Sequence, residues 1–235
     1  MWPFENQPIV LLSVCMANSF FPFFSLGFHC NPFRTLTDEE WAEIAVIPSY
    51  VQQKLVVGYE NLQVLGEKGY GKTTILLSIA AEKRHHGRRI AYEYIPEDGR
   101  TFQTPLDNLD DFFLDEAQRL EKKERKRLLT HPNAPSLVIA SHEDLASLFA
   151  AYGRSLTTIK LGQTELAHLQ AVLNRRLAYS SLTEHPPFTF TDEAVQQLWD
   201  KFGRNIRATE HYLYEYFQQL LVDDKKNSNW FKLPE

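Results

Sequence analysis

The chain has 235 residues, which is enough for one large domain or for a mid-sized domain with a smaller one. Hydrophobic residues make up 43% and charged residues 23%, so the composition excludes a wholly disordered chain and supplies enough apolar mass for a packed core. The 25 Lys and Arg residues are outnumbered by 30 Asp and Glu residues, and a net charge of −5 argues against a protein that coats nucleic acid. The two cysteines, Cys15 and Cys30, cannot build a disulfide framework and have no zinc-ligand spacing with a histidine pair, so we expect a cytoplasmic protein.

The N-terminal segment is rich in Phe. Its apolar run over 8–30 is interrupted by Pro22 and Gly27 and has no Lys or Arg before it, so neither a membrane span nor a signal peptide is expected. The only internal methionine is Met16. One interpretation is therefore that residues 1–15 are an upstream extension of the reading frame without a structural role.

Strand and helix patterns alternate along the middle of the chain. Short apolar runs that end at Gly, Pro or Asp predict strands, and amphipathic stretches between them predict helices. This alternation indicates right-handed crossovers and a parallel sheet. The expected strands are 62–65, 89–95, 109–114, 136–140 and 158–161, and the expected helices are 38–44, 50–57, 73–84, 117–129 and 145–152, followed by a small helical domain at 164–180, 191–201 and 205–222.

A glycine-rich motif lies between the first expected strand and the helix that follows it. The stretch from Gly66 to Thr73 reads G-E-K-G-Y-G-K-T and matches the phosphate-binding pattern G-x-x-x-x-G-K-T. Its glycines let successive backbone N–H groups face a phosphate, and the helix N-terminus adds positive potential. Lys72 is expected to reach the β- and γ-phosphates, and Thr73 to offer its hydroxyl to Mg²⁺. The flanking strand and helix argue against an ordinary Gly-rich turn, so we predict a nucleoside triphosphate site made by Gly66, Glu67, Lys68, Gly69, Tyr70, Gly71, Lys72, Thr73 and Thr74.

Two carboxylates end the third expected strand. Asp115 and Glu116 follow three apolar residues, at the sheet edge where the phosphate loop should also lie. We expect Asp115 to hold Mg²⁺ through water and Glu116 to polarise the attacking water. An ordinary acidic helix start is the alternative, but the nearby phosphate loop favours the catalytic interpretation.

Further polar residues are candidates whose roles stay open. Ser141 and His142 end the fourth expected strand, where either side chain could orient water against the γ-phosphate or cap the next helix. In the helical region, Arg204 or Arg207, with Arg207 preferred, could sense the γ-phosphate or lie on the solvated surface. Arg154 precedes the fifth expected strand and is the candidate for an arginine offered to a neighbouring subunit's nucleotide.

These motifs together resemble those of AAA+ ATPases, and most of all the branch of ExeA and the transposition regulators TniB and TnsC. The resemblance is carried by the segments 64–74, 114–120 and 138–145 and extends over 24–220. It implies a P-loop sheet of AAA+ type with a C-terminal helical lid, and ATP and Mg²⁺ as ligands. It also implies a switch that assembles with itself in the ATP state and acts on a partner protein or on DNA. The entry segment of that branch, similar here to Phe24 and Asn31-Pro32-Phe33, would pack near the adenine.

A DNA partner is the less favoured expectation. The segment 96–111 is too short for the full helix that relatives carry between these strands, where DNA or partner contacts commonly lie. Basic runs at 83–89 and 122–127 could touch a polyanion. In the second run Glu residues recur at helical spacing, which favours a solvated helix face.

Two functions are compatible with the motifs. The first is an ATP hydrolase that acts as a molecular switch, and the second is a slow or non-hydrolysing nucleotide-gated scaffold. Glu116 favours the first. A GTPase would need an N-K-x-D motif and an ABC ATPase an L-S-G-G-Q signature, and neither is present. The expected divisions are an N-terminal arm (1–30), a P-loop ATPase core (31–162), a helical lid (163–222) and a polar tail (223–235).

Overall fold

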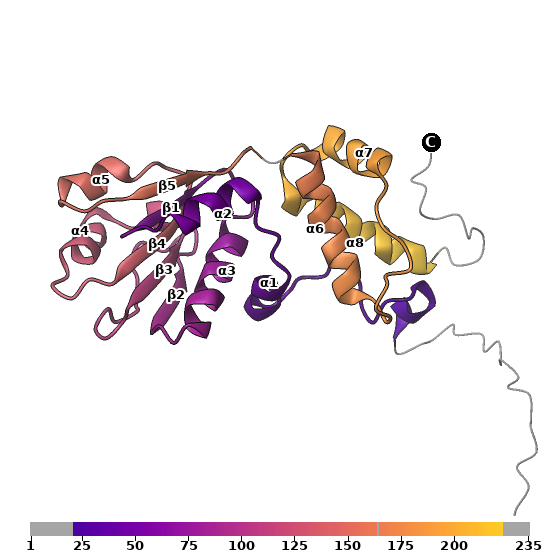
Figure 1. Ribbon diagram of the computed structural model, residues 1–235, viewed down its shortest axis with the longest axis horizontal. Coiled ribbons are helices and arrows are strands. Elements are labelled where there is room, and N and C mark those ends of the chain that lie inside the picture. The colour runs from indigo at the N-terminus through magenta and orange to yellow at the C-terminus, as the bar shows by residue number, and fades with distance from the viewer. Residues whose placement is uncertain (1–20, 164, 223–235) are drawn as a thin grey trace, which may run out of the picture.

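The computed structural model describes residues 21–163 and 165–222, and five parallel strands form its central sheet (Figure 1). The strand order β2-β3-β4-β1-β5 confirms the expected parallel α/β arrangement. The predicted upstream extension (1–15) and the predicted polar tail (223–235) lie outside the described residues. The strands are β1 (Leu62–Leu65), β2 (Ile90–Tyr94), β3 (Asp111–Asp115), β4 (Ser136–Ser141) and β5 (Thr157–Lys160).

Helices cover both faces of the sheet. Neighbouring residues of a strand point to opposite faces, so a strand that is apolar throughout needs to be covered on both sides. Phe113 packs with residues of α2 (Ser49–Val56) and α3 (Lys72–His85). Its neighbour Phe112 packs with residues of α4 (Lys122–Thr130) and α5 (Ala146–Ala151) on the other face. Both phenylalanines are fully buried. The middle of β3 is therefore apolar at consecutive positions, as expected for a strand of a parallel sheet that is covered on both sides.

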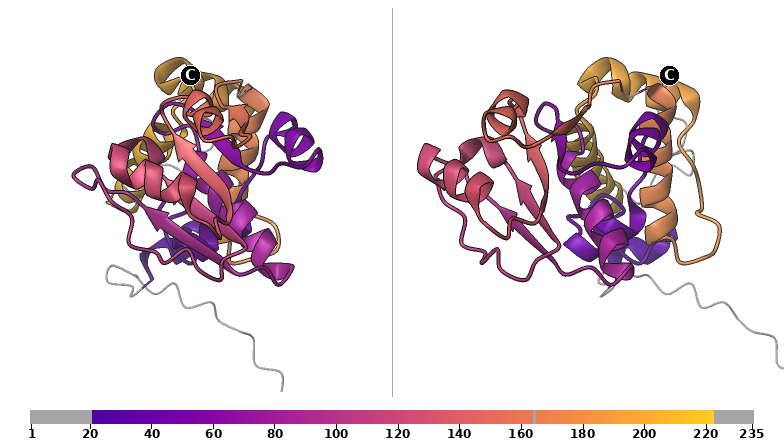
Figure 2. Two further views of the ribbon diagram at one scale, coloured as in Figure 1. Left: turned by 90° about the vertical axis from the view of Figure 1, so that its left-hand side faces the viewer. Right: turned by 60° about the vertical axis from the view of Figure 1, so that its left-hand side comes forward.

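Three helices form a second unit beside the sheet rather than over one of its faces (Figures 1 and 2). They are α6 (Leu166–Ser180), α7 (Asp192–Phe202) and α8 (Ile206–Val222). Helix α1 (Asp38–Ile44) lies between the two units and contacts α3 and α6. Its start is fixed by a capping box in which Thr37 and Glu40 bond each other's backbone N–H.

The Phe-rich segment packs into the helical unit. Its short 3-10 helix η1 (Pro22–Leu26) precedes Phe28, which is fully buried in the same cluster as Leu173 and Phe217. Backbone bonds from His29 N to Ser180 O and from Leu182 N to Gly27 O, each 3.0 Å long, join the segment to the end of α6. The arm thus completes the lid core, which its sequence alone did not reveal.

The prediction of one helix over 117–129 was wrong. A 3-10 turn η2 (Ala117–Arg119) and helix α4 are separated there, because Leu120 is extended and buries its side chain in the core. Between β2 and β3 the chain forms no helix, as the short segment suggested, and Phe102 is instead buried against the sheet. Within the described residues, no helix is both long and apolar enough to cross a bilayer.

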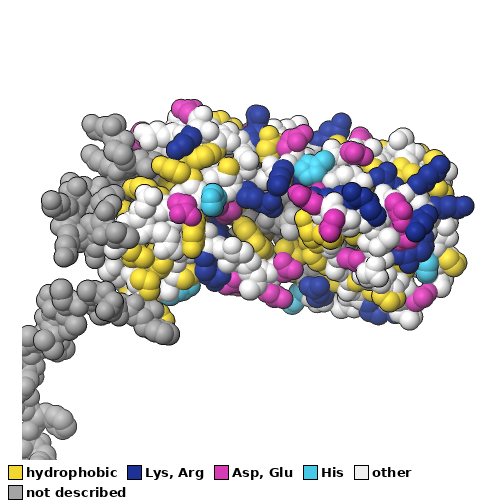
Figure 3. All heavy atoms as spheres, turned by 180° about the vertical axis from the view of Figure 1, so that it is seen from behind, with side chains coloured by type: hydrophobic (Ala, Val, Ile, Leu, Met, Phe, Trp, Pro, Cys, Tyr) yellow, Lys and Arg dark blue, Asp and Glu magenta, His cyan; other side chains and the backbone are white. Residues whose placement is uncertain are grey.

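Much of the first basic run is neutralised within the chain. Lys83 and Arg88 both pair with the buried carboxylate of Asp111, and Arg89 pairs with Asp110. Figure 3 shows Lys and Arg side chains interspersed with Asp and Glu over the face that it presents. These pairs favour a structural role for the run.

Candidate functional site

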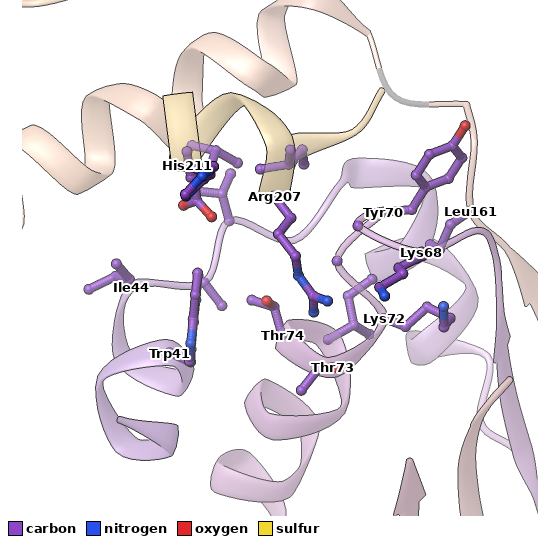
Figure 4. A pocket seen from close by; sticks show the side chains of 18 of the residues that line it. Trp41, Ile44, Lys68, Tyr70, Lys72, Thr73, Thr74, Leu161, Arg207 and His211 are labelled. Carbon is purple, nitrogen blue, oxygen red and sulfur yellow. The ribbon is translucent and has the colours of Figure 1, made fainter. Parts of the chain in front are cut away.

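A cavity of about 1010 Å³ separates the carboxyl end of the sheet from the helical unit (Figure 4). The glycine-rich loop, with Glu116 after β3 and His142 after β4, supplies one end of its lining, and α1, α6 and α8 supply the other. Such a cavity is large enough for a nucleotide.

The glycine-rich loop is held in a shape that only glycine tolerates well. Gly69 and Gly71 both have φ of +86°, and a Cβ on Gly69 would meet Oδ1 of Asn205 at 2.1 Å. Lys72 is 6% exposed, and its Nζ donates to the carbonyl oxygens of Gly66 at 2.9 Å and Glu67 at 3.2 Å. Burial lowers the pKa of Lys72, although the nearby carboxylates oppose that shift.

The two predicted magnesium ligands lie in direct contact. Thr73 Oγ1 donates to Asp115 Oδ2 over 2.6 Å, and Tyr92 donates to the same oxygen over 3.3 Å. Burial raises the pKa of Asp115, and the hydrogen bond from Thr73 partly offsets that effect. No group of three or more His, Cys, Asp or Glu residues that could hold a metal occurs in the described part of the chain. A hydroxyl beside one carboxylate suits Mg²⁺, which takes its remaining oxygens from phosphates and water.

Glu116 has a strained backbone and a heavily contacted side chain. Its φ of 60° and ψ of 39° are left-handed, an uncommon conformation that often occurs at functional sites. Gln118 donates to its carboxylate at 2.7 Å, and Arg119 and His142 each place a nitrogen 3.2 Å from it. Burial opposes ionisation of Glu116, but these contacts outweigh it and lower the pKa.

The structure separates the two candidates at the end of β4. His142 lines the cavity, and its Nε2 lies 3.2 Å from Lys72 Nζ and 3.2 Å from Glu116 Oε1. Ser141 is fully buried, accepts a hydrogen bond from Gln63 and donates one to the backbone oxygen of Glu143. The structure thus does not bring Ser141 to the cavity, and this placement argues against its proposed contact with water.

The two candidate arginines of the helical unit lie in different pockets. Arg207 lines the cavity, and Figure 4 shows its side chain pointing from α8 toward Thr74 and the glycine-rich loop. Arg204 lines a smaller neighbouring hollow, where its guanidinium carbon lies 5.8 Å from the centre of the Trp199 ring. Of the two, Arg207 is placed to meet a phosphate.

Arg154 lies at the amino-terminal end of the strands, opposite to the end that carries the cavity. Its Nη2 donates to Asn61 Oδ1 at 2.8 Å and to the carbonyl of Pro135 at 3.0 Å, and these partners precede β1 and β4. The glycine-rich loop follows β1, so Arg154 and the loop are separated by the length of the strand. Its guanidinium is engaged within its own chain, and its contact with a neighbouring subunit stays a prediction.

The far end of the cavity contains charged residues that sequence reasoning missed. Arg176 on α6 and Glu210 on α8 line it together with Trp41 of α1. Arg176 Nε lies 3.3 Å from Glu210 Oε1, and their side chains are 2% and 12% exposed. A signal existed in the sequence, because Arg176 adjoins Leu173 and Leu177 on the apolar face of an amphipathic helix.

Several solved structures have a similar arrangement of elements at low sequence identity. Domain III of the replication initiation protein DnaA from Thermotoga maritima has a TM-score of 0.58 and 16% identity, covering 83% of this chain and 94% of that one. The RuvB Holliday junction branch migration motor from Thermotoga maritima has a TM-score of 0.59 and 18% identity, covering 84% and 70%. AMPPCP-bound DnaA from Aquifex aeolicus has a TM-score of 0.50 and 17% identity, covering 79% and 68%.

These similarities show the fold. The chain has a P-loop fold of AAA+ type, with a five-stranded parallel sheet and flanking helices. No protein-family model and no curated protein sequence matches it. The fold alone does not define a substrate, partner or reaction, which depend on the residues of the site.

Proposed function

We propose that this chain binds and hydrolyses ATP as a molecular switch of the AAA+ type. The observation that carries the proposal is the meeting of three separate segments in one cavity: the glycine-rich loop, Glu116 and His142, with Asp115 bonded to Thr73 beside them. The loop and the two carboxylates have recognised tasks in phosphoryl transfer. The AMPPCP bound to one structural neighbour supports a nucleotide as the ligand.

The chain's own groups divide the work. The loop N–H groups and Lys72 would hold the β- and γ-phosphates, with Lys72 exchanging its bonds to loop carbonyls for phosphate oxygens. Glu116 would take a proton from the attacking water. His142 would help to position either Lys72 or Glu116, because its Nε2 lies 3.2 Å from both and can either accept from Lys72 or donate to Glu116. Arg207 would contact the γ-phosphate from the lid.

Thr73 and Asp115 would hold Mg²⁺, because both present oxygen ligands at one point. When bound, the ion neutralises charge on the β- and γ-phosphates. The 2.6 Å bond between Thr73 and Asp115 keeps the two ligands together without the ion.

A nucleotide-gated scaffold with slow turnover is the second candidate. The observation that favours it is the crowding of the Glu116 carboxylate by Gln118, Arg119 and His142. A base with a lowered pKa and several donors around it accepts a proton less readily. The two candidates differ in turnover rate and agree on binding.

We further propose that the ATP state assembles with itself and acts on a partner protein. Neighbours described as a replication initiator and a branch migration motor make DNA a second possible partner. The pairing of Lys83, Arg88 and Arg89 with Asp110 and Asp111 argues against a free basic patch at that run. The closer assignment to the ExeA and TniB–TnsC branch is supported by sequence motifs alone.

Replacement of Glu116 by Gln tests hydrolysis directly. We expect ATP affinity to persist and phosphate release to fall by a factor of about 10²–10⁴, because the amide cannot accept the proton. The measurement is single-turnover phosphate release, with Glu121→Gln as the matched control because that carboxylate contacts the surface residue Lys123. Equal rates in wild type and Glu116→Gln would contradict the catalytic role. A wild-type rate near background would support the scaffold instead.

The same variant tests assembly. Light scattering should find larger particles of Glu116→Gln with ATP than with ADP, because the trapped ATP state is the proposed assembled one. If Arg154 contributes to a neighbour's site, Arg154→Ala in that background should remove the size difference. Equal sizes with both nucleotides would contradict assembly, and a difference that survives Arg154→Ala would remove Arg154 from the interface.

A further inference from the structure

The Arg176–Glu210 pair is buried but incompletely bonded. The guanidinium of Arg176 lies over the rings of Phe33 and Trp41, at 5.9 and 5.1 Å from their centres, and also donates to the backbone oxygen of Arg34. Apart from the 3.3 Å ion pair between Arg176 Nε and Glu210 Oε1, these two atoms and Arg176 Nη1 are buried without a hydrogen bond among the described residues. Buried polar atoms are nearly always bonded, so such a group calls for a ligand or a specific role.

The pair lies at the end of the cavity away from the phosphate loop. Arg207 and Glu210 are three residues apart on α8, so they share a face and Glu210 stands about 5 Å further along the helix. Figure 4 shows Trp41, Ile44 and His211 on the side of Arg207 opposite to Lys72. A nucleotide whose phosphates lie at Lys72 and Arg207 would extend its base toward this end.

The lining at this end suits a flat heteroaromatic ring. Trp41, Ile44 and Val172 offer apolar surface, and the pair offers a carboxylate acceptor beside guanidinium donors. Glu210 lines the cavity, and its side chain is 12% exposed.

We infer that Glu210 reads the base of the bound nucleotide, its carboxylate accepting a hydrogen bond from the 6-amino group of adenine while Arg176 positions that carboxylate. This inference rests on the proposed function, because it requires a triphosphate on the P-loop. Arg176 acts here as a positioning residue, since its polar atoms face Glu210 and its flat faces are covered by Phe33 and Trp41.

The chemistry selects adenine over guanine. Adenine carries a donor at position 6, whereas guanine carries an oxygen acceptor there, which a carboxylate repels. Selection requires the ionised carboxylate, because a protonated carboxyl could donate to the guanine oxygen; burial raises the pKa of Glu210, and the adjacent Arg176 opposes that shift. Base selection at this end is therefore separate from phosphate binding at the other.

Equilibrium binding of nucleotide analogues tests the inference. Purine riboside triphosphate carries hydrogen in place of the 6-amino group, and we expect wild type to bind it about tenfold more weakly than ATP. In Glu210→Ala the two ligands should bind within about twofold of each other, because the acceptor is gone. The matched control is Glu215→Ala, an exposed carboxylate on the same helix, which should keep the wild-type ratio.

A second variant guards against loss of folding in Glu210→Ala. Glu210→Gln keeps the side-chain shape, and its amide can donate to the oxygen of guanine, so the preference for ATP over GTP should narrow several-fold. An unchanged ATP preference in both variants would overturn the inference. It would also be overturned if wild type bound ATP and purine riboside triphosphate equally.

The same binding measurements distinguish a ribose contact of Glu210 from a failure of the proposed function. If Glu210→Ala lost discrimination only against 2′-deoxy-ATP, the carboxylate would hold the ribose and the inference would be wrong. If wild type bound none of the triphosphates, the proposed function itself would fail. Equal binding of all of them by wild type would leave that function standing and remove only the base-reading role of Glu210.

Discussion

The two ends of the cavity are built in different ways. At the phosphate end a continuous stretch of seven residues, Lys68 to Thr74, lines the cavity. At the other end Trp41, Arg176 and Glu210 come from three helices far apart in the chain. Phosphate binding would thus depend on local backbone shape, whereas base recognition would depend on how the helical unit packs against α1.

Their hydrogen bonding differs as well. At the phosphate end Lys72 bonds to loop carbonyls and Thr73 bonds to Asp115, so the groups are held in place before a ligand arrives. At the base end Arg176 and Glu210 retain atoms without hydrogen bonds among the described residues. A ligand would therefore replace existing bonds at the phosphate end, whereas at the base end it would meet an ion pair that is already formed.

The largest expected effect concerns the phosphate end. Lys72→Ala should weaken ATP binding by at least about 100-fold, because it removes a buried charge that makes charge-assisted bonds to two phosphates. Lys123→Ala is the control, since Lys123 lies on α4 outside the cavity and its side chain is 73% exposed. Fluorescent-nucleotide titration measures both, and equal losses in the two variants would mean that general charge, rather than the Lys72 position, binds the phosphates.

A smaller effect is expected where the lid meets the phosphates. Arg207→Ala should weaken ATP by about tenfold and leave ADP nearly unchanged, because its contact is with the γ-phosphate. Arg204→Ala should change neither affinity, since Arg204 lies over Trp199 outside the cavity. Calorimetry with both nucleotides checks this pair. The reverse pattern would assign the sensing role to Arg204.

The difference between the two ends also explains what the sequence could predict. The parallel sheet and the phosphate loop follow from short local patterns, and the structure has strands at all five expected places. The contact of Thr73 with Asp115 follows from the topology, because strand ends of a parallel sheet meet at one edge. Trp41, Arg176 and Glu210 form no local pattern, so only tertiary packing brings them together.

Local ambiguity accounts for the other differences. Ser141 and His142 are adjacent and strand residues alternate in direction, so a one-residue uncertainty in the strand end decides which side chain faces the cavity. The charged stretch at 117–129 has a helical pattern throughout, but burial of Leu120 breaks it. Arg154 has the position expected for an intersubunit arginine, yet Asn61 and Pro135 hold its side chain within the chain.

A structure of the chain with AMPPCP and Mg²⁺ tests the central claim most directly, namely that one nucleotide spans both ends of this cavity. We expect the β- and γ-phosphates within hydrogen-bond reach of the backbone N–H groups from Gly69 to Thr73 and of Lys72 Nζ. We expect the adenine 6-amino group at the Glu210 carboxylate. Triphosphate density away from the glycine-rich loop, or an adenine ring outside the space between α1 and α8, would contradict the account.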